Sequence, residues 1–279
     1  MPEASPPRKP VLPIRLLDEW GALWLRTFAL IGGVAYLILD VSVWLLRGLF
    51  QRRVRIGRTA VVTQMVRVGV RSIGIVVLVC GCIGFILALQ MKPPLADFGQ
   101  TDKIANIVGV AVFRELGPLI AAIVLTGFAG ASIAAEIGTM VVGEEIEALE
   151  AHALNPVRFL VVPRIIATTV SLTLLTVIGD LTAVISGGLM TVGFLGVPYE
   201  LYKANTLNQL VIHDFITGLI KAAVFGLILS AIACHNGLKV TGGAAGVGRA
   251  TTSTVVQTVV AVIVADLMFT AIFYSIGWT

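Results

Sequence analysis

Long apolar runs separated by short polar segments dominate the chain. Four runs are long enough to cross a bilayer and a fifth is just sufficient: Ile73 to Met91, Ile104 to Ala135, Val161 to Leu195, Leu207 to Ala233, and Thr254 to Trp278. A spanning helix needs about 20 apolar residues, because it rises about 1.5 Å per residue across the hydrocarbon core. The pattern therefore predicts an all-α, polytopic membrane bundle of five transmembrane helices.

The apolar segment that precedes these runs admits two interpretations. Residues 27–46 have the hydropathy of a sixth span, but arginines lie on both sides, so both ends favour the cytoplasmic face. Gly32 and Gly33 interrupt the run, and Asp40 lies within it. We predict an interfacial or re-entrant elbow helix over residues 12–58; the alternative is a true span.

Composition supports one membrane domain without a separate soluble domain. The 279 residues are 57% hydrophobic and 13% charged, and the mean hydropathy is +0.96, outside the range of a soluble domain. We expect residues 1–11 to be a disordered cytoplasmic tail without a cleavable signal, and residues 59–279 to form the transmembrane domain. The three cysteines lie inside or at the end of apolar runs and are expected to be small apolar fillers rather than disulfide or metal ligands.

The distribution of basic residues predicts the orientation. Residues 1–71 hold eleven of the twenty Lys and Arg, and the loops at 136–164 and 234–250 hold two each. The opposite side has only Lys92, Lys103 and Lys203. Because Lys and Arg are retained in cytoplasmic segments, the N-terminus is predicted to be cytoplasmic and the C-terminus extracytoplasmic. The crowding of cations is thus a membrane-orientation signal and does not indicate a nucleic-acid partner.

The loop at 136–164 contains the pattern of a short amphipathic helix. Ile146 and Leu149 are apolar at helical spacing, and acidic residues surround them. The acids at the start suit the positive end of the helix dipole. These acidic positions are Glu144, Glu145, Glu147 and Glu150. The helix, from Glu144 to Ala151, is either a solvated connector or a docking element that fits a groove on a partner.

Charged residues also occur inside the predicted spans, where each costs about 2.5 to 3.5 kcal/mol to insert. They are Arg114, Glu115, Asp180, Asp214, Lys221 and Asp266. Asp214 and Lys221 are seven positions apart and so share a helix face. Three roles are open: internal ion pairs that fix helix packing, a polar lining for a lipid headgroup by Arg114, Glu115 or Lys221, and a proton relay.

No catalytic or cofactor motif is recognisable in the sequence. The stretch GAAGVGRA at 243–250 has the glycine spacing of a P-loop, but Arg249 and Ala250 stand where Lys and Ser or Thr are required. We interpret this stretch as a glycine-rich cytoplasmic turn. Metalloprotease and serine-hydrolase motifs are also missing. The chain is therefore predicted to be neither an enzyme nor a metal or cofactor protein, and ATP hydrolysis would come from another chain.

Four linked motifs resemble the MlaE (YrbE) family of ABC-transporter permeases. They are FRELGPLIAAIVLTG at 113–127, AAEIGTM at 134–140, EEIEALEAHALNPVRFLVVPR at 144–164 and GVGRATTSTVV at 246–256. The resemblance runs from about residue 60 to the C-terminus.

The resemblance implies a homodimeric permease in a bacterial inner membrane. It further implies two cytoplasmic ATPase subunits, an extracytoplasmic MCE-domain protein and the movement of phospholipid or a related lipid between membranes. Within the family, the motif that contains Arg114, Glu115 and Leu116 faces the lipid cavity, and the loop helix from Glu144 to Ala151 couples to the ATPase. The rival hypothesis is a proton-coupled secondary transporter that uses Asp180, Asp214 or Asp266.

Overall fold

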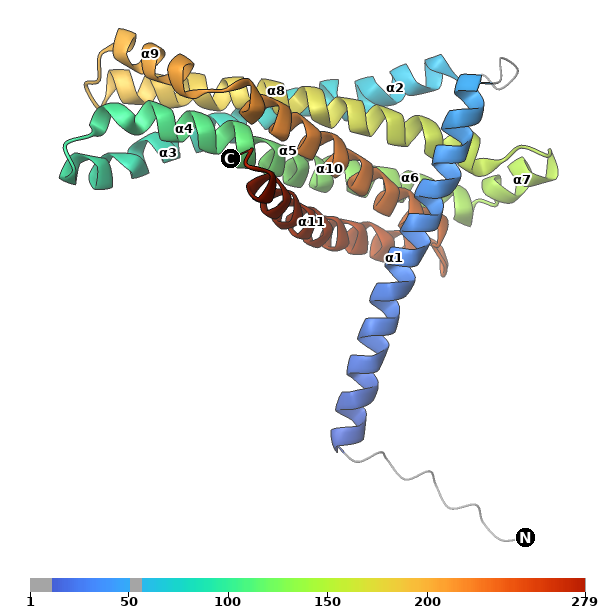
Figure 1. The fold of residues 1–279 in the computed structure, drawn as a ribbon. Helices are drawn as coiled ribbons and strands as arrows, with labels where there is room; N and C mark the ends of the chain where they lie inside the picture. Colours follow the sequence, from blue (N-terminus) through green and yellow to red (C-terminus); the bar gives the residue numbers. More distant parts are fainter. Residues whose placement is uncertain (1–11, 51–56, 279) are drawn as a thin grey trace, which may run out of the picture.

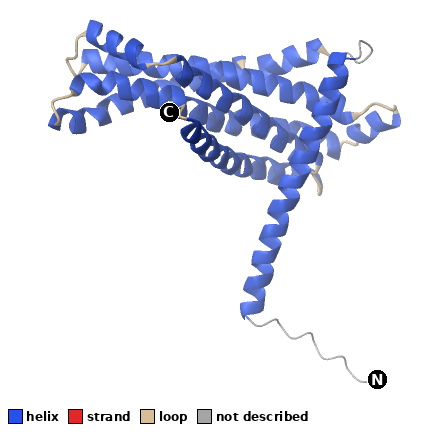
Figure 2. Cartoon of the chain, in the orientation of Figure 1, coloured by secondary structure: helices blue, strands red, loops and turns tan. Residues whose placement is uncertain are grey.

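The computed structural model describes residues 12–50 and 57–278, and every regular element in these ranges is helical (Figures 1 and 2). The predicted tail over residues 1–11 lies outside the described residues. By length and composition, the described ranges contain six helices capable of crossing a membrane. The chain is thus a polytopic helical bundle, as the sequence predicts.

Besides the candidate span in the N-terminal helix, the described residues contain five long helical stretches, and these run side by side in the bundle (Figure 1). The first comprises α2 (Arg58–Val68), η1 (Val70–Ser72) and α3 (Ile73–Asp97). The second comprises η2 (Thr101–Lys103), α4 (Ile104–Ala111), η3 (Val112–Leu116), α5 (Gly117–Leu125), η4 (Thr126–Gly130) and α6 (Ala131–Val142). The third comprises η5 (Val157–Val161) and α8 (Val162–Gly193), and the last two are α10 (Ile212–Leu238) and α11 (Gly243–Ile276). Two short helices lie in the connections, α7 (Glu145–Ala151) and α9 (Tyr199–Gln209).

The sixth candidate span is part of α1 (Leu12–Phe50), which crosses the other helices near the end of the bundle that carries α7 (Figure 1). Its helix continues through Gly32 and Gly33 without a break, and the predicted interfacial or re-entrant elbow stays a prediction. Gly33 has a packing role instead. A Cβ there would lie 2.2 Å from Cε1 of His235, so glycine permits α1 to rest on α10. Whether α1 is interfacial or spans the bilayer stays a matter of prediction.

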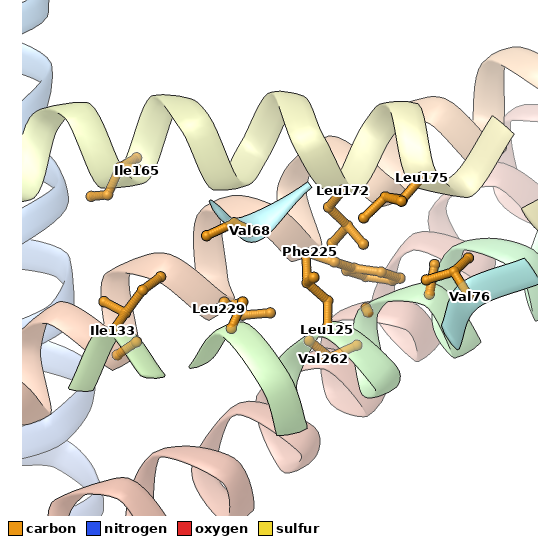
Figure 3. Close-up of a cluster of buried hydrophobic side chains, with 14 of the residues drawn as sticks. Val68, Val76, Leu125, Ile133, Ile165, Leu172, Leu175, Phe225, Leu229 and Val262 are labelled. Carbon is orange, nitrogen blue, oxygen red and sulfur yellow. The ribbon is translucent and has the colours of Figure 1, made fainter. Parts of the chain in front are cut away.

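The core lies around α8, which packs against both α3 and α10. Figure 3 shows Phe225 and Leu229 of α10 near Leu125 of α5 and Leu172 of α8; all four are fully buried. Small residues bring the backbones together, as is usual for membrane helices. At Gly84 of α3, for example, a Cβ would lie 2.0 Å from the carbonyl oxygen of Ala183.

Two predicted boundaries are wrong. The run that starts at Leu207 is broken between α9 and α10, because Asp214 accepts a hydrogen bond from the Val211 amide and starts α10 at Ile212. The glycine-rich stretch at 243–250 is not a turn but the first two turns of α11. Its Gly246 allows close packing, since a Cβ there would lie 2.0 Å from the Thr241 carbonyl oxygen.

Candidate functional site

A π-helical segment, η3, carries the adjacent charges Arg114 and Glu115 in the middle of the second span. A π turn inserts one residue into the helix and shifts the side chains that follow, and such turns often mark functional sites. A glycine of the neighbouring helix α10 faces it. A Cβ at Gly218 of α10 would lie 2.2 Å from the Phe113 carbonyl oxygen, so α10 can pack directly on the segment.

Glu115 belongs to a four-residue polar network that joins three helices. Nζ of Lys221, on α10, lies 2.6 Å from Oε2 of Glu115 and 2.9 Å from Oδ1 of Asp266 on α11. The same ammonium group donates to the Thr270 hydroxyl at 2.9 Å, and that hydroxyl lies 3.0 Å from Oε1 of Glu115. Lys221 is only 1% exposed, so these contacts replace its hydration.

Arg114 forms a separate ion pair, with Asp214 near the start of α10. The Asp214 carboxylate is buried and also accepts a hydrogen bond from the Val211 amide at 3.1 Å. Asp214 and Lys221 therefore do share a face of α10, as the spacing predicts. They do not pair with each other: each binds one of the two adjacent charges on η3.

A small cavity of about 20 Å³ lies beside these charges. It has room for about one water molecule. Arg114, Glu115 and Lys221 line it, together with Thr270. The fourth predicted lipid-cavity residue, Leu116, is half-buried and is not part of this lining. The structure thus brings three of the four together, and their part in lipid binding stays a prediction.

Thr270 is a member of the network that was not predicted from the sequence. Its hydroxyl also donates to the Asp266 carbonyl oxygen at 2.9 Å, which fixes it on the same face of α11 as Asp266. The spacing of four positions is a usable signal, because a hydroxyl one turn from an intramembrane acid shares its environment. Asp180 lies outside the network, and its Oδ1 is buried without a hydrogen-bond partner among the described residues.

The predicted docking helix projects from one end of the bundle, with its main packing contact on α6 (Figure 1). It begins at Glu145 rather than Glu144, because Glu144 adopts a left-handed conformation (φ 58°) before the first turn. The four glutamates are exposed, whereas Ile146 and Leu149 are half-buried. Part of the apolar surface that Ile146 and Leu149 would offer to a partner is therefore already covered by the chain itself.

A second ionic cluster, also missed in the sequence, lies near the base of α7. Oε1 of Glu136, on α6, lies 2.9 Å from Nη1 of Arg67 on α2 and 3.1 Å from Nη2 of Arg164 on α8. Because α6 leads directly into α7, this carboxylate ties the docking helix's own span to two neighbouring helices. Linear sequence offers no signal for these pairs, because the three residues come from separate spans.

No group of three or more His, Cys, Asp or Glu in the described ranges is arranged to hold a metal ion. The chemistry that the site offers is therefore ionic and hydrogen-bonding. Cations and acids are held at fixed positions inside an apolar bundle, next to a small cavity.

Comparisons with known proteins agree with this architecture. The model of the family described as Permease MlaE matches residues 61–272. A probable ABC transporter permease protein of Rickettsia prowazekii is 38% identical over 216 residues, which cover 77% of this chain and 83% of that protein. The intermembrane phospholipid transport system permease protein MlaE of Haemophilus influenzae is 33% identical over 217 residues, covering 77% and 83%. The chloroplastic protein TRIGALACTOSYLDIACYLGLYCEROL 1 of Arabidopsis thaliana is 32% identical over 212 residues, covering 76% and 61%.

Proposed function

The chain belongs to the MlaE permease family and is the permease subunit of a lipid-transporting ABC system, and we propose how its parts share the work. Two copies form the transport unit in a bacterial inner membrane. A cytoplasmic ATPase binds each copy at α7, and an extracytoplasmic MCE-domain protein binds the opposite end. The permease itself is non-catalytic and moves phospholipid. The observation that carries this proposal is the pair of partly exposed charges on η3.

The charges on η3 suit a lipid headgroup. The side chains of Arg114 and Glu115 are 28% and 37% exposed, whereas those of their partners Asp214 and Lys221 are 1% exposed. The buried partners hold the two charges in place, and the charges themselves stay accessible from one side. A guanidinium group can bind a phosphate in a bidentate manner, so Arg114 is the expected phosphate contact.

The exposed face of α11 suits a second copy of the chain. Only 6% of the apolar window of α11 is buried, compared with 61% for the third span, which contains α8. Val260, Leu267 and Met268 are more than half exposed on it. Asp266 and Thr270 lie on the same helix. A dimer formed through α11 would therefore place the Lys221 network of each copy beside the shared interface.

The cytoplasmic end suits the ATPase. The acidic rim of α7 and its two apolar residues project beyond the bundle, and the Glu136 cluster connects α6 to α2 and α8. A displacement of α7 would therefore be transmitted to the spans that contain α6, α2 and α8. This link is the proposed route by which nucleotide-driven movement changes the cavity.

The proton-coupled alternative has weaker support. Asp214 and Asp266 are both engaged in ion pairs that join helices, so they already have a packing role, and Asp180 is the one of the three acids without an ion pair among the described residues.

Native mass spectrometry of the complex purified from its own membrane tests the proposed assembly. The expected mass is two permease chains, two ATPase chains, an MCE-domain protein and bound phospholipid. A particle with a single permease chain, or one without an ATPase, would contradict the proposal.

A further inference from the structure

A groove of about 530 Å³ lies between α8 and α9, at the end of the bundle opposite α7 (Figure 1). Its volume is in the range of ligand sites in proteins, which is about 300 to 1,000 Å³. None of the ion-paired residues of the η3 network, the Arg114–Asp214 pair or the Glu136 cluster lines it. The groove is therefore separate from the cavity at η3 and needs its own explanation.

Two helical faces form the walls. The α8 wall has apolar residues one helical turn apart, such as Ile185 and Leu189, and both are more than 60% exposed. The α9 wall follows the spacing i, i+4, i+8 with Tyr199, Lys203 and Leu207. This spacing places the residues on one face of α9. α9 thus presents a mostly apolar face to α8 without closing the gap.

The groove is held open by contacts at its floor. The Tyr202 hydroxyl donates to the Val184 carbonyl oxygen at 3.0 Å. Gly188 permits this approach, since a Cβ there would lie 2.8 Å from the Tyr202 ring. Asn205 donates to the Asp102 carbonyl oxygen at 2.8 Å and fixes the other side of α9. The space is therefore preformed.

Lys203 is the one charged side chain in the described lining. It is exposed, and it has no ion-pair partner within 4.0 Å among the described residues. Lys and Tyr side chains at the end of a span typically lie at the level of the lipid headgroups. The groove thus combines an apolar channel with an unpaired cation at headgroup level, next to Tyr199.

We infer that this groove binds one phospholipid molecule, with an acyl chain between α8 and α9 and its phosphate on Lys203. The α8 wall runs from Val184 to Gly193, about 13 Å along the helix axis, which accommodates much of an acyl chain. The positive charge of Lys203 complements the negative charge of the lipid phosphate. The site lies on the outer wall of the bundle, so it does not depend on the transport function.

Photo-crosslinking tests the inference. The full-length protein, purified with its partner subunits, is placed in nanodiscs of phosphatidylethanolamine with a small fraction of phosphatidylglycerol carrying a diazirine on one acyl chain. Crosslinked peptides are mapped and quantified. The expected product is lipid attached to α8 at Ile185 or Leu189. A diacylglycerol probe with the same diazirine chain lacks the phosphate and is expected to label these positions less.

Two variants with matched controls make the result specific. Gly193 lines the groove, and a Cβ there would meet no atom within 4 Å, so Gly193→Trp fills the space without a backbone clash. It is expected to abolish labelling of α8. Gly74→Trp, also at an open glycine, is the control that leaves labelling unchanged.

Lys203→Gln is expected to lower phosphatidylglycerol labelling roughly fivefold and to leave diacylglycerol labelling unchanged, whereas Lys103→Gln alters neither.

Two results would overturn the inference. Equal labelling of all outward helix faces, insensitive to Gly193→Trp, would mean ordinary annular lipid only. No lipid attached to Ile185 or Leu189 in the wild-type complex, while other outward helix faces are labelled, would mean that the groove is closed to lipid.

Discussion

Nζ of Lys221 lies 2.6 Å from Oε2 of Glu115, although 106 positions separate the two residues in the chain. The pair joins α10 to η3, and Asp266 extends it to α11. Because the lysine is buried between two acids, its charge is neutralised locally. The proposed headgroup site is therefore also a support for the packing of three helices.

Replacing Lys221 by Met should destabilise the bundle, because Glu115 and Asp266 would face each other without a cation. Loss of one member of a buried ionic cluster costs about 3 to 5 kcal/mol, so the thermal midpoint of the purified protein should fall clearly. Lys203→Met, at an exposed position, is the control.

The double variant Glu115→Gln with Lys221→Met should recover part of this stability, because one uncompensated charge is removed. Strictly additive losses in the two single variants and the double variant would contradict the pairing.

Replacing Arg114 by Ala should reduce the phospholipid that copurifies, whereas the ATPase should still assemble. Arg114→Ala leaves the buried Asp214 unpaired, so the informative variant is Arg114→Ala with Asp214→Asn, which removes that charge as well. Lipid is quantified by mass spectrometry and assembly by size-exclusion chromatography. Normal lipid content in the folded double variant would show that Arg114 serves packing alone.

Replacing Ile146 and Leu149 together by Asp should release the ATPase or uncouple its hydrolysis from transport. Full burial of such side chains is worth about 1.5 to 3 kcal/mol each, and these two supply less because they are already half-buried. Pull-down of the ATPase measures the effect. The control carries Asp at Phe98 and Phe194, which are 79% and 77% exposed at the opposite end. Wild-type assembly and transport with both docking residues replaced would rule out α7 as the contact.

Cysteine labelling tests the orientation. In a cysteine-free background, Gln100→Cys and Glu200→Cys should react with a membrane-impermeant maleimide from outside the cell. His152→Cys and Lys239→Cys should react only after the membrane is opened. Labelling of His152→Cys in intact cells would reverse the proposed topology.

The sequence was sufficient to predict the helical class and the five long spans, because their apolar runs exceed the length that a bilayer requires. Boundaries failed where a local contact outweighs hydropathy. Asp214 caps α10 and so ends the run that began at Leu207. Glycine at 246 serves close packing inside α11, although glycine-rich sequence commonly indicates a turn.

The sequence indicated which residues form the candidate site, but it did not indicate which of them form ion pairs with each other. Intramembrane charge alone singles out Arg114, Glu115 and Lys221. The choice of partners depends on the π turn at η3, which has no clear signature in the sequence. Helix α9 was missed for a different reason: its apolar face is short and carries Lys203, so hydropathy merged its last residues with the next span.

In the proposed function, ATP hydrolysis by a partner subunit drives lipid movement through this permease. The most direct test is transfer of fluorescent phospholipid by the purified complex in proteoliposomes supplied with ATP. We expect transfer that stops when the ATPase is omitted and continues when a proton uncoupler is added. Transfer that persists without the ATPase and collapses with the uncoupler would contradict it and favour proton coupling.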